Sequence, residues 1–239
     1  MNRLDKELHR RGLAKSRTAS ASLIAEGKVA VNRRLCTDVS RAVQPDDLIE
    51  ITGEPPRYVS RGGLKLECAL EVFGINLSGV TCLDAGASTG GFTDCMLQHG
   101  ASRVYAVDVG SSQLDATLRD EPRVVSMERC DIRALQEQAQ LPEKVGFASV
   151  DLSFISVKQA LPAVKEALIS GGGAVVLIKP QFELGRKHKG VITDTKLQAK
   201  IVEDITGFAE MSGFTVKGVI ESPILGKEGN REFLMWVNN

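Results

Sequence analysis

A glycine-rich turn between an apolar run and a helix constrains this chain more than any other feature. Residues 80–83 (VTCL) are apolar and β-branched, which predicts a short buried strand. The turn DAGASTGG occupies residues 84–91, and Phe92 begins a predicted helix. A strand that passes through glycines into a helix N-terminus is how α/β folds hold nucleotide-like ligands, because glycine lets the backbone approach the ligand closely.

The spacing of the glycines argues against a dinucleotide. Gly86, Gly90 and Gly91 form G-x-x-x-G-G, whereas the dinucleotide fingerprint is G-x-G-x-x-G. Asp84 would repel a pyrophosphate, but it suits a positively charged ligand. S-adenosylmethionine has an ammonium and a sulfonium and no phosphate, so the turn favours this cofactor. A tight turn without a ligand is the alternative.

Composition is that of an ordinary soluble globular protein. The 239 residues are 43% hydrophobic and 25% charged, enough for one core and a small second module. No apolar run approaches the roughly 20 residues of a membrane-spanning helix, and the N-terminus has no signal-peptide core, so we expect a cytoplasmic protein. Five scattered cysteines and three distant histidines predict neither a disulfide nor a metal site.

The net charge of zero hides a basic N-terminal segment. Residues 1–44 contain 10 Lys and Arg against 4 Asp and Glu, whereas residues 45–239 contain 20 against 26. A basic head on an acidic body indicates contact with a polyanion. The head is predicted to form helices over 3–12 and 17–26, the second capped by Ser16, followed by a small hairpin-rich sheet.

Residues 1–52 resemble the alpha-L RNA-binding domain. The resemblance rests on RLDK at the start, SR opening the second helix and GKVAVN after it, and it implies RNA binding. The module has no aromatic residue, so it is expected to recognise shape and phosphate rather than to stack on bases. The candidate RNA-binding residues of this module are Arg3, Lys6, Arg10, Arg11, Lys15, Arg17, Lys28, Arg33 and Arg34.

Residues 53–59, with two prolines, form a predicted semi-rigid linker to a body over 60–239. The body alternates strands and helices, which predicts a doubly wound, mostly parallel seven-stranded α/β sheet. Predicted strands lie near 80–84, 103–107, 123–127, 146–151, 173–178, 214–220 and 232–237. Predicted helices lie near 63–73, 90–98, 112–119, 155–169 and 194–212. The last strand follows too closely for a helical crossover and should pair antiparallel; the glycines at 171–173 are expected to form a helix-to-strand turn.

An acidic residue follows each of four successive predicted strands. Asp84 would face the charged methionine end of the cofactor, Asp108 the ribose hydroxyls and Asp131 the adenine amino group. Each acidic residue by itself is weak evidence for a cofactor site, because acids at strand ends often cap the next helix. The candidate cofactor residues are Asp84, Gly86, Ser88, Gly90, Gly91, Phe92, Asp108, Asp131 and Asp151.

The body resembles the FtsJ-like S-adenosylmethionine-dependent ribose methyltransferases, and the whole chain resembles the TlyA family, whose members are named haemolysins. The resemblance rests on SRGGLKL, LDAGASTGGFTDC, YAVDVG, DLSFIS, LIKPQFE and NREFLMW. It implies a Rossmann-like methyltransferase that methylates a ribose 2′-hydroxyl of ribosomal RNA. It also implies a catalytic tetrad, which falls on Lys65, Asp151, Lys179 and Glu232.

The chemistry of this reaction explains the tetrad. A ribose hydroxyl is a poor nucleophile, so the protein must align it and assist removal of its proton. Lys179 follows an apolar strand and precedes Pro180, and it is the expected base; Lys65 occupies a first helical turn, where the dipole disfavours a cation. Asp151 and Glu232 would hold the lysines. Two structural salt bridges are the alternative.

Other functions stay open. Arg186, Lys187 and Lys189 form either an RNA clamp or a solvated basic loop. A base N-methyltransferase would carry D/N-P-P-Y/F, which residues 151–154 (DLSF) match without the prolines. A membrane-active haemolysin would need an apolar span or a basic amphipathic helix, and a ribosome-assembly factor could bind the cofactor without turnover. We expect ribosomal RNA or a ribosomal subunit as partner, no membrane, and a monomer or weak dimer.

Overall fold

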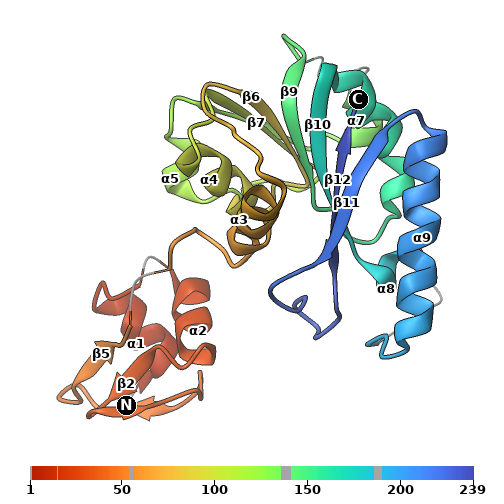
Figure 1. The fold of residues 1–239 in the computed structure, drawn as a ribbon. Helices are drawn as coiled ribbons and strands as arrows, with labels where there is room; N and C mark the ends of the chain where they lie inside the picture. The colour runs from red at the N-terminus through yellow and green to blue at the C-terminus, as the bar shows by residue number, and fades with distance from the viewer. Residues whose placement is uncertain (1, 15, 54–55, 136–140, 186–189) are drawn as a thin grey trace. The chain divides into compact units, whose positions relative to one another are not determined.

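The computed structural model describes residues 2–14, 16–53, 56–135, 141–185 and 190–239 (Figure 1). The chain divides into two units, Met1–Pro55 and Pro56–Asn239. Residues 57–59, which we expected in the linker, are bonded within the second unit. Val59 N donates to Asp94 (2.8 Å) and Gln98 donates to the Arg57 carbonyl (2.9 Å).

The N-terminal unit combines two helices with short antiparallel strands. Helices α1 (Leu4–Arg10) and α2 (Arg17–Ala25) are the predicted pair, and the Ser16 side chain caps α2 by accepting from Ala19 N (3.1 Å). The strands are β1 (Asn2–Arg3) paired with β4 (Ala42–Val43), and a sheet in the order β3 (Arg34–Leu35), β2 (Val29–Val31), β5 (Ile49–Ile51). Leu4, Leu8, Ile24 and Val29 are fully buried, so helices and sheet share one small core.

The C-terminal unit is built on one seven-stranded sheet in the order β11-β12-β10-β9-β6-β7-β8 (Figure 1). The strands are β6 (Thr81–Ala85), β7 (Arg103–Asp108), β8 (Val124–Glu128), β9 (Val145–Val150), β10 (Leu168–Ile178), β11 (Thr215–Glu221) and β12 (Phe233–Asn238). Strand β12 pairs antiparallel with both β10 and β11, and β10-β9-β6-β7-β8 are parallel. The predicted doubly wound sheet with an antiparallel last strand is confirmed.

Helices cover both faces of this sheet. Helices α3 (Gly62–Phe73), α4 (Gly91–Gln98) and α5 (Ala116–Arg119) pack on one face, through Leu66, Met96 and Leu118 among others. Helices α7 (Leu161–Ala167) and α9 (Thr195–Met211) pack on the other. The short helices η1 (Ile132–Ala134), η2 (Val157–Gln159) and α8 (Pro180–Glu183) follow β8, β9 and β10. Within the described ranges, no helix has the length and apolarity to cross a membrane.

Two predicted elements differ from the structure. The helix predicted over 155–169 is η2 followed by α7, and Leu168 already begins β10. The glycines at 171–173 therefore lie inside a strand, where pairing with β9 is interrupted between Leu168 and Gly173. Gly173 has no room for a side chain, because a Cβ there would lie 2.1 Å from the Trp236 indole. The helix predicted over 112–119 begins only at Ala116.

Candidate active site

Three strands bring acidic and basic side chains to one edge of the sheet. Asp151 and Lys179 are the first residues beyond the parallel neighbours β9 and β10. Ile178 pairs with Phe233 in the antiparallel β10–β12 ladder, so the next residues, Lys179 and Glu232, lie opposite each other. The carboxyl edge of a parallel sheet is where α/β folds place their ligands.

Lys179 is held by the loop that follows β9. Its Nζ lies 2.5 Å from Asp151 Oδ1, donates to Ser153 Oγ at 3.2 Å, and lies 5.7 Å from the centre of the Phe182 ring. The Lys179 side chain is 11% exposed, so its ammonium is held at a fixed place in a largely buried setting. Such an ammonium can hold or exchange one proton at a defined place.

Lys65 and Glu232 form a second ion pair at the same edge. Lys65 lies in the first turn of α3, as predicted, and its Nζ donates to Glu232 Oε2. The two side chains are 11% and 3% exposed. Removing either partner would leave a buried charge uncompensated, which is costly. The four tetrad residues therefore form two cation–carboxylate pairs, contributed by α3, by the residue before β12, and by the residues that follow β9 and β10.

The glycine turn lies directly beside Asp151. Gly86 has φ +91°, and a Cβ there would lie 2.3 Å from the Asp151 carbonyl oxygen. Only glycine fits, because both the backbone conformation and the close approach exclude a side chain. The cofactor turn and the predicted catalytic loop are thus in contact.

Asp84 differs from the expectation that it faces a ligand. It lies inside β6, is fully buried, and accepts hydrogen bonds from Thr93 Oγ1 (2.6 Å) and Ser149 Oγ (2.9 Å). Burial raises the pKa of Asp84 to about 6, although both hydroxyls favour its charged form. Asp84 therefore ties β6 to β9 and to α4 beneath the turn.

Three further turn residues belong to the packing. Gly90 and Gly91 are buried, and Phe92 is 3% exposed in the core between α4 and the sheet. A Cβ at Gly90 would meet Leu118, a Cβ at Gly91 would meet Ser60, and the Phe92 ring is buried. Any contact of these residues with a cofactor would therefore come from their backbone.

Asp108 organises the open side of the turn. Its carboxylate accepts from Ser88 N (2.8 Å) and Gly110 N (2.7 Å), and it lines a pocket with Gln113 and Glu128. Glu128 ends β8 at the same edge as the predicted acids and accepts from Ser112 N (2.7 Å). Sequence reasoning missed it because the strand was expected to end at 127, which left its last residue unexamined.

Asp131 lies just beyond β8, as expected, and its carboxylate forms an ion pair with Arg133. Arg133 contacts both of its carboxylate oxygens, with Nη2 2.6 Å from Oδ2, and these hydrogen bonds lower the pKa of Asp131. Arg133 also donates to Gln159 (2.9 Å). Asp131 is thus a charged acceptor held in place beside the edge.

Phe154 is a second residue that sequence reasoning missed. It is 80% exposed, has φ +70°, and its ring centre lies 5.2 Å from that of Phe182. A bulky side chain with positive φ in a loop beside charged groups stores backbone strain, a frequent mark of a functional residue. The DLSF segment was the available signal, but it was considered only as a weak base-methyltransferase motif.

Glu183 links the two loops of the edge. Its carboxylate accepts from Ser156 Oγ and from Val157 N (3.0 Å), which joins α8 to η2. Burial raises the pKa of Glu183, although both hydrogen bonds oppose the shift. The segments that carry Phe154 and Lys179 are therefore fastened to each other.

Among the described residues no group of His, Cys, Asp and Glu is arranged to hold a metal ion.

The candidate RNA-binding residues of the N-terminal unit separate into two kinds. Arg3, Arg10 and Arg17 have half-exposed or more exposed side chains that pair with carboxylates, and Lys6, Arg33 and Arg34 are exposed. Lys28 pairs with Glu26 (3.2 Å). Lys15, Arg186, Lys187 and Lys189 lie outside the described residues.

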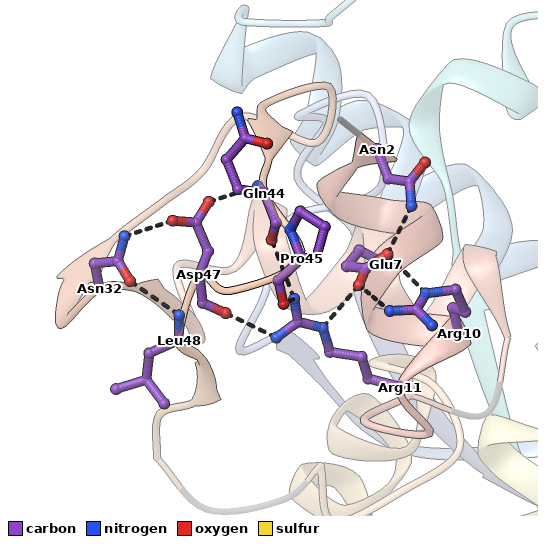
Figure 2. Close-up of polar contacts among 9 residues, drawn as sticks. All are labelled: Asn2, Glu7, Arg10, Arg11, Asn32, Gln44, Pro45, Asp47 and Leu48. Atoms are coloured by element: carbon purple, nitrogen blue, oxygen red, sulfur yellow. Dashed lines mark hydrogen bonds and ion pairs between the residues drawn. The ribbon is translucent and has the colours of Figure 1, made fainter.

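Arg11 is the exception. Figure 2 shows its guanidinium between Glu7 and the segment 44–47: it donates to Glu7 Oε1 (2.8 Å) and to the carbonyls of Asp47 (2.7 Å), Pro45 (2.9 Å) and Gln44 (3.2 Å). Its side chain is 22% exposed. Because these contacts use all three nitrogens, Arg11 braces the fold and has fewer donors left for a phosphate than Arg10. Its role as a phosphate ligand stays a prediction.

Rossmann-like methyltransferases share this sheet, with its antiparallel last strand and a glycine turn at the carboxyl end of its first strand, here β6. The C-terminal unit falls in that class. The chain belongs to the FtsJ-like methyltransferase family, whose sequence signature matches residues 58–239, and an S4 domain matches residues 2–49. Both resemblances inferred from the motifs are confirmed.

Relatives extend over both units. The 16S/23S rRNA (cytidine-2′-O)-methyltransferase TlyA of Mycobacterium tuberculosis is 42% identical, over 98% of this chain and 89% of its own. A solved Streptococcus thermophilus protein that carries the hemolysin name is 41% identical, with a TM-score of 0.79 over 100% of this chain and 88% of its own. An S-adenosylmethionine dependent methyltransferase from Mesorhizobium loti is 19% identical, with a TM-score of 0.52 over 72% of this chain and 96% of its own, which shows the fold alone.

Proposed function

We propose that this protein transfers a methyl group from S-adenosylmethionine to a ribose 2′-hydroxyl of ribosomal RNA, and that its S4 unit binds the RNA. The observation that carries the proposal is the Lys179–Asp151 pair, with Nζ 2.5 Å from Oδ1, beside the glycine turn. A base N-methyltransferase has no need of two lysine–carboxylate pairs. The Mycobacterium tuberculosis relative is named as an enzyme of the same kind, an rRNA (cytidine-2′-O)-methyltransferase.

The residues at the edge fit this cofactor. When bound, S-adenosylmethionine supplies an electrophilic methyl group on a sulfonium that leaves readily. The edge offers acceptors and negative charge: Asp108 would hold the ribose hydroxyls and Asp131 the adenine amino group. Gly86 keeps the turn close to Asp151, and the backbone of Ser88, Gly90 and Gly91 would complete the cradle. Asp84 stabilises the turn through its buried hydrogen bonds with Thr93 and Ser149.

Lys179 would either donate a hydrogen bond that orients the attacking hydroxyl, as an ammonium, or accept the proton of that hydroxyl, as a neutral amine. Asp151 and Ser153 fix its Nζ, so the hydroxyl meets a base or donor at a defined position rather than a mobile side chain. Lys65 and Glu232 supply a second cation and carboxylate, which would orient the ribose and balance the charge.

Phe154 would receive a nucleobase. Its ring is exposed and packs against the Phe182 ring, which in turn lies 5.7 Å from Lys179 Nζ, and base–aromatic stacking requires an accessible ring face near the reacting sugar. A base that stacks there would have left its helix, which single-stranded or loop nucleotides do at least cost. Because ribosomal RNA is the proposed substrate, we place the protein in the cytoplasm.

The test is single-turnover transfer from radiolabelled S-adenosylmethionine to naked ribosomal RNA, separate subunits and whole ribosomes. Digestion of the product to nucleosides locates the methyl group. We expect a 2′-O-methylnucleoside with wild-type protein and none with Lys179→Ala. A methylated base would replace the proposal by base methylation, binding without transfer would indicate an assembly factor, and leakage of liposomes at micromolar protein would revive the haemolysin reading.

A further inference from the structure

Two buried carboxylates lie inside the basic N-terminal unit. Asp5 and Glu7 stand on α1, and their side chains are 5% and 2% exposed. A negative charge in an RNA-binding module ordinarily weakens the attraction for phosphate. Their burial and their partners give them another role.

Asp5 holds two arginines from different segments. Arg3 Nε lies 3.0 Å from Oδ1 and Arg17 Nη2 lies 2.9 Å from Oδ2, while the two arginine side chains stay 50% and 56% exposed. Burial alone would raise the pKa of Asp5, but the hydrogen bonds from Arg3 and Arg17 hold it at about 2. Asp5 is therefore charged at neutral pH and joins the start of α1 to the start of α2.

Glu7 holds Arg10 by two parallel contacts. Arg10 Nε donates to Oε2 (2.9 Å) and Nη2 to Oε1 (2.5 Å), and Asn2 Nδ2 also donates to Oε2 (3.0 Å), as Figure 2 shows. These hydrogen bonds, with that of Arg11, hold the pKa of Glu7 well below its usual range. The Arg10 side chain remains 63% exposed. A two-point pair fixes the plane of the guanidinium and leaves other N–H donors free to turn outward.

We propose that Asp5 and Glu7 are positioning residues for RNA: they hold the guanidiniums of Arg3, Arg17 and Arg10 in place, so that RNA phosphates meet ordered donors. The inference rests on the proposed RNA binding by this unit. An arginine that is already ordered loses less side-chain freedom when it binds, which improves affinity without a new contact. The prediction is contrary to simple charge counting: removing a negative charge weakens RNA binding.

The test compares neutralised variants of the full chain. Glu7→Gln and Asp5→Asn keep the side-chain shape, and Glu50→Gln removes an exposed carboxylate on β5 of the same unit as a matched control. The probe is deproteinised bacterial 23S ribosomal RNA, with Kd measured at several KCl concentrations. We expect Glu7→Gln and Asp5→Asn to raise Kd by about 2- to 10-fold, and Glu50→Gln to leave it unchanged or lower it.

A double-mutant cycle separates positioning from folding. Arg10→Gln should raise Kd and reduce the slope of log Kd against log salt by about 1. In that background Glu7→Gln should add little, because the side chain it positions is gone. Hydrogen exchange of α1 and α2 in the full chain shows whether each variant folds. If Glu7→Gln unfolds the N-terminal unit, a second double-mutant cycle replaces the first. It combines Asp5→Asn with Arg17→Gln and tests the positioning role in the same way.

The outcomes are distinct. Equal or tighter RNA binding by folded Glu7→Gln and Asp5→Asn, as for Glu50→Gln, would overturn the positioning role while RNA binding stands. If Arg10→Gln and Arg17→Gln also leave Kd unchanged, α1 and α2 do not contact the RNA, and both the inference and the proposed role of the S4 unit fail. Methyl transfer by the C-terminal unit is measured separately and is unaffected by that result.

Discussion

Lys179 and Asp151 end neighbouring parallel strands, and their side chains meet with Nζ 2.5 Å from Oδ1. The pair lies next to the glycine turn, because the Asp151 backbone packs against Gly86. One acidic residue therefore contacts both the predicted base and the predicted cofactor loop.

Lys179→Ala should lower the rate of methyl transfer by about 100- to 10,000-fold, the usual contribution of a positioned acid or base. Binding of S-adenosylmethionine should stay near the wild-type level, since the described contacts of Lys179 are with Asp151, Ser153 and Phe182. Single-turnover transfer and calorimetric titration of the cofactor measure the two effects. Full activity in the variant would contradict the assigned role.

The pH dependence of stability should reveal Asp84. Its pKa is about 6 in the folded chain and 3.8 in the unfolded reference, so the native state binds more protons between these values. The free energy of unfolding should therefore fall as pH rises from about 4 to about 6, by about 3 kcal/mol from this group. Asp84→Asn should lack this part of the decrease. Urea unfolding followed by the fluorescence of Trp236, the single tryptophan, measures it; identical pH profiles would refute the assignment.

Phe154→Gly should separate stability from function. Glycine relieves the strain at φ +70°, which offsets the lost contact with Phe182, so the free energy of unfolding should change by less than about 1 kcal/mol. Loss of a stacking face should lower kcat/KM for RNA by about 10- to 100-fold, with KM for the cofactor unchanged. Phe154→Tyr, which keeps the ring, is the control. Equal kcat/KM in wild type and Phe154→Gly would remove Phe154 from the site.

Arg11→Lys should destabilise the N-terminal unit. One ammonium cannot reach the buried Glu7 carboxylate and the more exposed carbonyls of residues 44, 45 and 47 together, so several of these acceptors lose their donor. Each unsatisfied group costs about 1–3 kcal/mol when it is buried. Hydrogen exchange of residues 42–51 should accelerate in the full chain. Lys6→Gln, which changes an exposed cation of α1, is the control, and equal protection in both variants would show that Arg11 is not a brace.

Local patterns in the sequence determined the elements and the reaction class. Apolar runs such as 173–178 predict strands whose two faces are both covered by other parts of the protein. The turn at Gly86 predicts a ligand site because only glycine readily adopts the backbone conformation of such a turn. Motifs at fixed spacing indicated the FtsJ-like family and the alpha-L RNA-binding domain. Where a short helix met a strand, as at Leu168, local signals could not locate the boundary, because pairing with β9 and β12 decided it.

The tertiary structure decided which residue does what. Lys65 and Glu232 are 167 residues apart, and no local rule pairs them. Asp84 and Asp108 look alike in sequence, yet one is buried and the other faces a pocket. Arg10 and Arg11 are neighbours in the sequence. The Arg10 side chain is 63% exposed and can present N–H donors to solvent, whereas the Arg11 side chain is 22% exposed and donates to Glu7 and to backbone carbonyls. Burial and long-range partners set these differences, and both exist only once the chain has folded.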